Sequence, residues 1–410
     1  MQSQPSIYLD HAATTRASED VVHAVTQAML EVYGNPSSLH TVGQLAERTL
    51  KTARRQVADA LGVSSANIIF TGSGTEADNL AILAGFKNPE KIRGRKVILS
   101  AFEHPAVREA ALSYGQHGAD VVFLPIDQST GCVKPSDLSD ALDRDAVLVS
   151  VMHVNNETGA VQPIEELSQV LSGFTNRYGE KPLFHTDAVQ SFGKIPVPAA
   201  CADLVSISAH KIHGPKGVGA LYARRPDRLQ AAIRGGGQEG GIRSGTENVP
   251  GIVGFGLAAE AAAANLAAGA RFVLRLRSML RDGILSRIPQ VKIGGPFEAS
   301  LEGRPGTSSP YILSVIFPGT RAEVLVHDLE RHGIYVSTGS ACANIGRKNR
   351  KGGNSILEAA GYTREEAEAT LRFSFGKENT PEEIESVLTC LEDAVGRFRQ
   401  LSPKYHMRLQ

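Results

Sequence analysis

Lys211 occupies a position in the sequence where a lysine could act as a catalytic amine. It closely follows the apolar run LVSIS, in the segment SISAHKIHGPKGVGALY. Parallel α/β sheets bind ligands at the carboxyl ends of their strands. A lysine at such an edge is partly desolvated, which favours its neutral amine and suits a Schiff base with an aldehyde cofactor. An isolated lysine beside a Gly-Pro turn would be a surface residue, so the interpretation depends on its companions.

Asp187 is the first of these companions. It ends another apolar run, in PLFHTDAVQS, and Gln190 lies just beyond it. A buried acid needs a cationic partner. A protonated pyridine nitrogen would supply one, and this pairing keeps pyridoxal phosphate (PLP) an effective electron sink. Without Lys211, an aspartate that caps the following turn would be the simpler interpretation.

A glycine-rich turn that opens a helix, FTGSGTEADNLAILAGF, is a candidate phosphate cradle. The backbone N–H groups at Gly74 and the hydroxyl of Thr75 would lie at the N-terminus of this helix, which favours anions. Ser208 and His210, next to Lys211, can supply further donors. The turn alone is weak evidence, because such turns are common and no Walker lysine follows it.

Two more polar residues follow predicted strands. His104 comes after KVILSAFE and is placed to stack on a flat cofactor or to move protons, although a lone histidine is more often structural. Asn156, in MHVNNETGAVQP, is placed to bond an aromatic hydroxyl or a substrate carboxylate. Five strand ends therefore carry one set of groups, which is more specific than any single motif.

The elements that must position these groups form an α/β pattern. Short apolar runs alternate with helix-like stretches, as in a largely parallel sheet covered by helices. An amphipathic stretch at 39–61 predicts a helix packed on this sheet. The seven predicted strands are 68–70, 96–100, 121–125, 147–152, 183–187, 204–208 and 219–223.

After Gly254 the chain changes character. An alanine-rich stretch, LAAEAAAANLAAGARFVLRLRSML, predicts one long helix that leads into a second domain. We expect a large cofactor-binding domain at 16–262, and a small domain made of 1–15 and 263–410 that carries a mobile loop at about 338–355. The small domain is expected to hold strands at 312–317 and 334–337 and helices at 321–332, 363–370 and 381–398.

Composition excludes several classes of protein. The 410 residues include 43 Lys and Arg and 43 Asp and Glu, so no global field favours nucleic acid or an anionic membrane. The chain has no signal-like N-terminus and no apolar run of about 18 residues. The four cysteines are too sparse for a disulfide framework or a structural zinc site. We therefore expect a soluble cytoplasmic protein without a metal site.

Together these motifs resemble the class V aminotransferase-like, fold-type I PLP enzymes, and within them the cysteine desulfurases of the NifS and IscS kind. The resemblance spans nearly the whole chain. It implies an α/β fold with a seven-stranded, mainly parallel sheet, helices on both faces and a smaller α+β C-terminal domain. The motifs that carry it are YLDHAATT, GNPSS, FTGSGTEADNLAI, EHPAV, VNNETGAVQ, HTDAVQSFGK, SAHKIHGPKGVGALY, GGGQEGGIRSGTEN, STGSAC and LRFSFG.

The resemblance also implies residue roles. Lys211 would hold PLP, Asp187 would pair with the ring nitrogen, Gln190 would contact the ring hydroxyl and His104 would stack on the ring. Phosphate would be bound by Gly74, Thr75, Ser208 and His210, with Thr246 reaching in from a second subunit, which implies a homodimer. The substrate carboxylate would be held by Asn35, Asn156 and Arg372, whose guanidinium fork suits it.

Cys342 resembles the catalytic cysteine of these enzymes. Its thiolate would attack the sulfur of bound L-cysteine, leaving alanine and an enzyme persulfide for an acceptor such as an iron–sulfur scaffold. The loop ANIGRKNRKGGNS after it has no apolar periodicity, as expected of a mobile loop. Its basic residues Arg347, Lys348, Arg350 and Lys351 can stabilise a thiolate or meet an acidic partner, but a solvated charge run is an equal alternative.

Two departures leave the sulfur acceptor open. The loop after Cys342 is more basic and slightly longer than the resemblance leads us to expect, and the C-terminal SPKYHMRLQ matches no docking signature. A selenocysteine lyase would use the same cofactor residues. A non-catalytic sulfur carrier or scaffold would have lost Lys211, Asp187, His104 and Gln190, which are all present, and a transaminase has no use for a loop cysteine.

Overall fold

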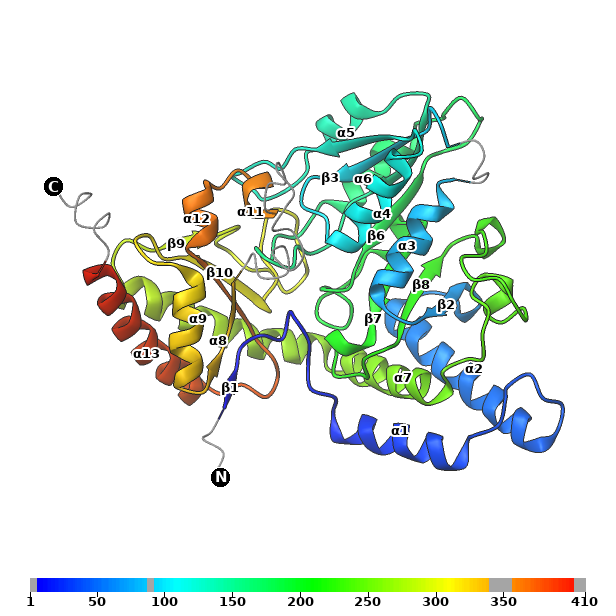
Figure 1. Ribbon diagram of the computed structural model, residues 1–410, viewed down its shortest axis with the longest axis horizontal. Coiled ribbons are helices and arrows are strands. Elements are labelled where there is room, and N and C mark those ends of the chain that lie inside the picture. The colour runs from blue at the N-terminus through cyan, green and yellow to red at the C-terminus, as the bar shows by residue number, and fades with distance from the viewer. Residues whose placement is uncertain (1–5, 87–91, 339–355, 402–410) are drawn as a thin grey trace.

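The computed structural model describes residues 6–86, 92–338 and 356–401, and Figure 1 shows a larger sheet on the right and a smaller one on the left. The larger sheet has the strand order β2-β8-β7-β6-β5-β3-β4. β8 is antiparallel to β2 and β7, and the other neighbours are parallel. The predicted seven-stranded, mainly parallel sheet is confirmed. Its strands are β2 (Ile68–Thr71), β3 (Lys96–Ser100), β4 (Asp120–Leu124), β5 (Ala146–Ser150), β6 (Leu183–Asp187), β7 (Leu204–Ser208) and β8 (Gly219–Ala223).

Both faces of this sheet are covered by helices. β5, β7 and β8 are buried along their whole length, as continuously apolar central strands must be. One face packs on α1, α2, α5, α6 and α7, and the other on α3 and α4. These helices are α1 (Glu19–Glu31), α2 (Thr41–Leu61), α3 (Gly74–Ala84), α4 (Pro105–Gly115), α5 (Pro135–Ala141), α6 (Ile164–Ser172) and α7 (Val249–Ala264).

The smaller sheet is antiparallel, in the order β12-β13-β10-β9, and has a core of its own. β1 (Ile7–Tyr8), from the start of the chain, pairs in parallel with β11 (Ile334–Tyr335) beside it. The other strands are β9 (Lys292–Gly294), β10 (Ile312–Ile316), β12 (Ser337–Thr338) and β13 (Thr370–Ser374). The helices of this part of the chain are α8 (Leu266–Arg287), α9 (Ala322–Arg331), α12 (Arg364–Glu368) and α13 (Pro381–Gln400), whereas α11 (Ile356–Ala359) packs Ile356 into the core of the larger sheet. The domain bounds given above stay a prediction.

The single alanine-rich helix predicted after Gly254 is wrong, because the chain forms two helices there. α7 and α8 meet at Asn265 and are bent by 74°. Asn265 has φ −108° and ψ 6°, and its side-chain amide donates to the Ala261 carbonyl at 2.9 Å. A short polar side chain that bonds its own backbone competes with helix propagation. The bend turns the chain from the larger sheet toward the smaller one (Figure 1).

The helix predicted at 363–370 is also too long. α12 ends at Glu368, and Thr370 is already the first residue of β13. All five residues of β13 are buried between β10 and β12, so the antiparallel neighbours on both sides decide its conformation.

No single helix within the described ranges has the length and hydropathy to span a membrane, and α7 with α8 passes such a test only as a bent pair.

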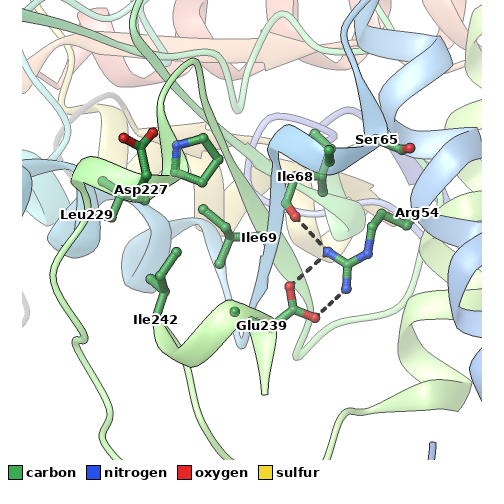
Figure 2. A pocket seen from close by; sticks show the side chains of 11 residues that line it. Arg54, Ser65, Ile68, Ile69, Asp227, Leu229, Glu239 and Ile242 are labelled. Atoms are coloured by element: carbon green, nitrogen blue, oxygen red, sulfur yellow. Dashed lines mark hydrogen bonds and ion pairs between the residues drawn. The ribbon is translucent and has the colours of Figure 1, made fainter. Parts of the chain in front are cut away.

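An ion pair covers the outer edge of β2, the edge strand of the larger sheet (Figure 2). Arg54 donates to the Ile68 carbonyl at 2.6 Å and to both Glu239 carboxylate oxygens at 2.8 and 2.6 Å. Glu239 in turn accepts from the Phe70 N–H at 3.0 Å. These bonds occupy backbone groups that could otherwise pair with a strand of another molecule. The pocket beside them, of about 470 Å³, contains none of the predicted cofactor or substrate residues.

Gly256 allows a test of the packing between α7 and α2. A Cβ at Gly256 would lie 2.8 Å from Ala53 Cα and 2.5 Å from Gln56 Oε1, so Gly256→Ala should lower the free energy of unfolding by about 1–3 kcal/mol. Gly396 of α13 is the matched control, because a Cβ there would meet no heavy atom within 4 Å. Gly396→Ala should raise stability by about 0.5–1 kcal/mol. Urea unfolding measures both, and equal effects would contradict the close contact.

Candidate active site

Lys211 and Asp187 lie at the carboxyl edge of the larger sheet, as predicted. Asp187 is the last residue of β6, and Lys211 ends a short 3-10 turn directly after β7. Asp187 is only 5% exposed, and burial raises its pKa to about 6, against the opposing effects of the Val189 N–H and the Lys211 charge. The two groups therefore lie within electrostatic reach of each other.

The N-terminal segment covers this edge. The Lys211 Nζ donates to the backbone carbonyls of Ala12 and Ala13 at 2.6 and 2.8 Å. The Gln190 amide donates to the Ala12 carbonyl at 2.9 Å. Three segments that are distant in sequence therefore meet at one peptide carbonyl. Sequence analysis assigned no role to the segment YLDHAATT. The only sequence feature that pointed to this segment was its place among the motifs that carry the family resemblance.

The predicted phosphate cradle contains an unused donor. The Ser208 hydroxyl is buried and has no hydrogen-bond partner among the described residues. Gly74, the first residue of α3, lies beside it, since a Cβ at Gly74 would be 3.4 Å from Ser208 Cβ and 2.9 Å from Val189 Cγ2. His210 bonds the Thr14 hydroxyl at 3.1 Å, and Thr75 is exposed at the start of the helix. A helix N-terminus with a buried free hydroxyl suits an anion.

His104 is held at the beginning of α4. Its Nδ1 accepts from the Ala106 N–H at 3.1 Å, so a neutral ring carries its proton on Nε2. Burial, with a smaller effect of the Lys211 charge, lowers the pKa of His104 to about 4. The ring is therefore neutral near pH 7 and close to Lys211.

Arg372 and Asn156 also come together. Arg372, only 4% exposed, donates to the Asn156 carbonyl at 2.9 Å and to Asp10 Oδ1 at 2.7 Å. The Arg372 Nε and the Asn156 Oδ1 are buried and without partners among the described residues. A guanidinium with a spare donor beside a side-chain amide is suited to bind a carboxylate. Sequence analysis missed Asp10, the carboxylate that orients this guanidinium.

Asn35 and Thr246 are not part of this buried group. Both are exposed. Asn35 lies on the loop between α1 and α2, where its side chain accepts from the Ser37 N–H at 2.9 Å, and Thr246 lies on the loop before α7. Cys342 and the basic residues Arg347, Lys348, Arg350 and Lys351 lie outside the described residues.

The other cysteines are poor nucleophiles. Cys132 is buried, and Cys201 and Cys390 are half-buried. Burial raises the pKa of each thiol, so all three are protonated at neutral pH, and the thiolate is the reactive form. Within the described ranges no three His, Cys, Asp or Glu side chains gather where they could hold a metal ion.

Several buried ionisable residues around the site were also missed by sequence analysis. Lys194 is 5% exposed, and burial with the Lys211 and Arg372 charges lowers its pKa to about 7. Burial raises the pKa of Glu103 and of Glu157 to about 8 in each case. For the two glutamates the sequence did offer a signal, because each is next to a predicted site residue: Glu103 precedes His104 in FEH, and Glu157 follows Asn156 in NNET.

Comparisons with known proteins agree with this geometry. The family model for aminotransferase class-V matches residues 7–387. The cysteine desulfurase IscS of Methanosarcina thermophila is 38% identical over 401 residues, which cover 97% of this chain and 94% of that protein. IscS of Clostridium botulinum is 38% identical over 400 residues, which cover 97% and 96%.

A solved structure supports the same assignment. A NifS-like protein superposes with a TM-score of 0.85 and 37% sequence identity, over 96% of this chain and 100% of that one. The predicted fold class is thus confirmed for nearly the whole length. The chain belongs to the aminotransferase class-V family of pyridoxal-phosphate enzymes and, within it, to the cysteine desulfurases.

Proposed function

We propose that this protein removes sulfur from L-cysteine, releases L-alanine and carries the sulfur as a persulfide on Cys342. One observation carries the proposal: the buried carboxyl group of Asp187 and the amine of Lys211 share one sheet edge with the unused hydroxyl of Ser208. Those three groups match the three polar parts of PLP, which are a ring nitrogen, an aldehyde and a phosphate.

The donor set fits PLP in detail. The unpartnered Ser208 hydroxyl beside Gly74, the first residue of α3, suits the phosphate, whose site Thr75, His210 and the partner subunit's Thr246 would complete. Asp187 would pair with the protonated ring nitrogen, and Gln190 would contact the ring hydroxyl. When bound, PLP supplies an electron sink for the charge left by removal of the substrate α-proton.

The chain's own residues do the rest. Lys211 would hold the aldehyde and then move a proton at its Nζ. The neutral ring of His104 would stack on the cofactor, where the proton on its Nε2 can be given and taken back. Arg372, Asn156 and Asn35 would fix the substrate carboxylate and so orient the bonds that react.

We assign sulfur transfer to Cys342 because its segment STGSAC resembles that of the catalytic cysteine of the cysteine desulfurases, and burial raises the pKa of the thiols of Cys132, Cys201 and Cys390. The Cys342 thiolate attacks the substrate sulfur, and an S–S bond forms as the Cβ–S bond breaks. The electron pair of the broken bond stays on carbon, which takes up a proton on the way to alanine. The persulfide would pass to an acceptor protein, such as an iron–sulfur scaffold, or to a thiolation pathway.

We also propose that the enzyme is a homodimer. The support is a run of exposed large apolar side chains along α1, the following loop and the start of α2, at Val22, Met29, Leu30, Tyr33, Leu39 and Leu45. Exposed apolar surface gathered on one part of a protein favours an interface there. Asn35 lies within this stretch, so a second subunit would cover it. Free thiols at Cys132, Cys201 and Cys390 support a reducing compartment such as the cytoplasm.

PLP binding should depend on the charge of Asp187. Because burial raises the pKa of Asp187 to about 6, this carboxyl group is charged above that pH and loses its pairing with the ring nitrogen below it. Affinity of the apoprotein for PLP should therefore fall as the pH drops through about 6. The PLP phosphate titrates in the same range, so Asp187→Asn is the reference. Absorbance titrations measure the PLP affinity of the wild type and of Asp187→Asn at each pH. An affinity that falls equally steeply with pH in both proteins would contradict the pairing of Asp187 with the ring nitrogen.

Cys342→Ser should keep the visible absorption of bound PLP and still bind cysteine, yet lose sulfide release under reductant by at least about 100-fold. Cys201→Ser, which changes a half-buried thiol, is the matched control and should turn over normally. Mass spectrometry after loading with cysteine should find the extra sulfur on Cys342. Near-normal turnover of Cys342→Ser would refute the role of Cys342. Alanine formation by the wild type that is fast with selenocysteine and not with cysteine would favour a selenocysteine lyase.

Arg372→Ala should raise the KM for cysteine by about 10- to 100-fold with little change in kcat, because a charged hydrogen bond to the carboxylate exists in both ground and transition states. The substitution also leaves the half-buried Asp10 without its partner. Asp10→Asn is therefore measured in parallel, and its KM should change far less. Steady-state kinetics that show a loss confined to kcat would argue against carboxylate binding.

A further inference from the structure

Asp187 is one of three buried acids behind the candidate site. Asp78 of α3 and Glu103, which follows β3, are each 1% exposed, and the charge of Asp187 acts on both. Three carboxylates cannot all be ionised there, because each would be desolvated next to like charges. The charge of Lys211 favours the ionised form of Asp187. The other two acids must then remain protonated.

Asp78 lies beside His185 of β6, whose ring is hydrogen-bonded to serines on both neighbouring strands. The His185 Nδ1 bonds the Ser150 hydroxyl at 2.8 Å, and its Nε2 bonds the Ser206 hydroxyl at 3.0 Å. The same Nε2 lies 3.6 Å from Asp78 Oδ1, a buried oxygen that has no hydrogen-bond partner among the described residues. Serine hydroxyls both donate and accept, so a neutral imidazole satisfies both of its nitrogens.

The protonation states agree with this geometry. Burial lowers the pKa of His185 to about 3, so the ring is uncharged. Burial, with repulsion from Asp187 and then Glu103, raises the pKa of Asp78 well above its ordinary value. Glu103 accepts from the Ser100 hydroxyl at 2.5 Å and the Met152 N–H at 2.7 Å, and its pKa is also raised, chiefly by burial, to about 8.

Asp78 is placed to couple two parts of the site. It belongs to the same helix as Gly74, about one turn from the predicted phosphate cradle. Its neighbour His185 bonds Ser206, which is the register neighbour of Asp187 across β6 and β7. His185 lies two residues before Asp187 on β6, and alternate residues of a strand share a face. A shift of Asp78 would therefore move the strand that carries Asp187 relative to α3.

We propose that Asp78 is a positioning residue that stays uncharged and acts through its contact with His185 to hold Asp187 in place as the only ionised member of the three buried acids. This inference rests on the proposed function, because Asp187 acts on the cofactor ring. Asp78 touches neither cofactor nor substrate. It serves as a neutral polar group against the His185 ring, so an amide should replace it and an aliphatic side chain of similar size should not.

The test compares holoenzymes of Asp78→Asn and Asp78→Leu by the pH titration of their visible absorption, retention of PLP on dialysis, and kcat and KM. Asp78→Asn should match the wild type within about twofold. Asp78→Leu should lose kcat about tenfold with an unchanged KM, shift the spectral midpoint by about half a pH unit and release PLP faster.

Thr186→Val is the matched control. Thr186 lies between His185 and Asp187, and its buried hydroxyl has no partner among the described residues. The substitution should therefore change neither the spectrum, nor PLP retention, nor kcat and KM.

Two results would overturn the proposal. Equal damage from Asn and Leu would mean that Asp78 works as an anion, and a wild-type spectrum and kcat in Asp78→Leu would mean that it positions nothing. If Asp78→Leu does not fold, Ser206→Ala removes the hydroxyl that holds the His185 Nε2 and should show the spectral shift to a smaller extent; an unshifted spectrum would refute the role of His185. Spectra and PLP retention need no turnover, so a wild type that fails to form alanine would count against the proposed function alone.

Discussion

The burial of one carboxyl group, Asp187, is the constraint on which the rest of the structure depends. A charge on a side chain that is 5% exposed is tolerable only with cations and donors fixed around it. Lys211 and the Val189 N–H provide part of that environment. The parallel sheet makes it possible, because it delivers β6 and β7 to the same edge from separate stretches of sequence.

The N-terminal segment unites the two sheets at this edge. Asp10 forms an ion pair with Arg372 of the smaller sheet, and the carbonyls of Ala12 and Ala13 accept from Lys211 beside the larger one. Thr15 continues the contact through two bonds to the His210 carbonyl, one from its N–H and one from its hydroxyl. The short backbone segment from Asp10 to Thr15 therefore contacts both the groups proposed to hold the substrate and the groups proposed to hold the cofactor, and so fixes the distance between them.

Much of this arrangement could be predicted from the sequence. Lys211, Asp187 and His104 were found because each follows an apolar run, and strands that are buried on both faces leave a clear signal. Asp78 and Glu103 were not found, because the burial of an acid depends on neighbours from distant strands. The break at Asn265 was missed for a related reason: its alanine-rich surroundings favour helix, and one side-chain bond to Ala261 decides otherwise. Asn35 and Thr246 are exposed, and their predicted roles need a second chain.

The pairing of β1 with β11 has a consequence for biosynthesis. Ile7 and its register partner Ile334 are separated by 327 positions (334 − 7), so this contact closes one of the longest loops in the molecule. A ribosome releases the first strand early, and every strand of the larger sheet follows before Ile334 is made. The nascent chain can assemble its larger core while β1 still lacks its partner strand. The segment that covers the vitamin-binding edge is thus anchored on both sides only after translation has passed Ile334.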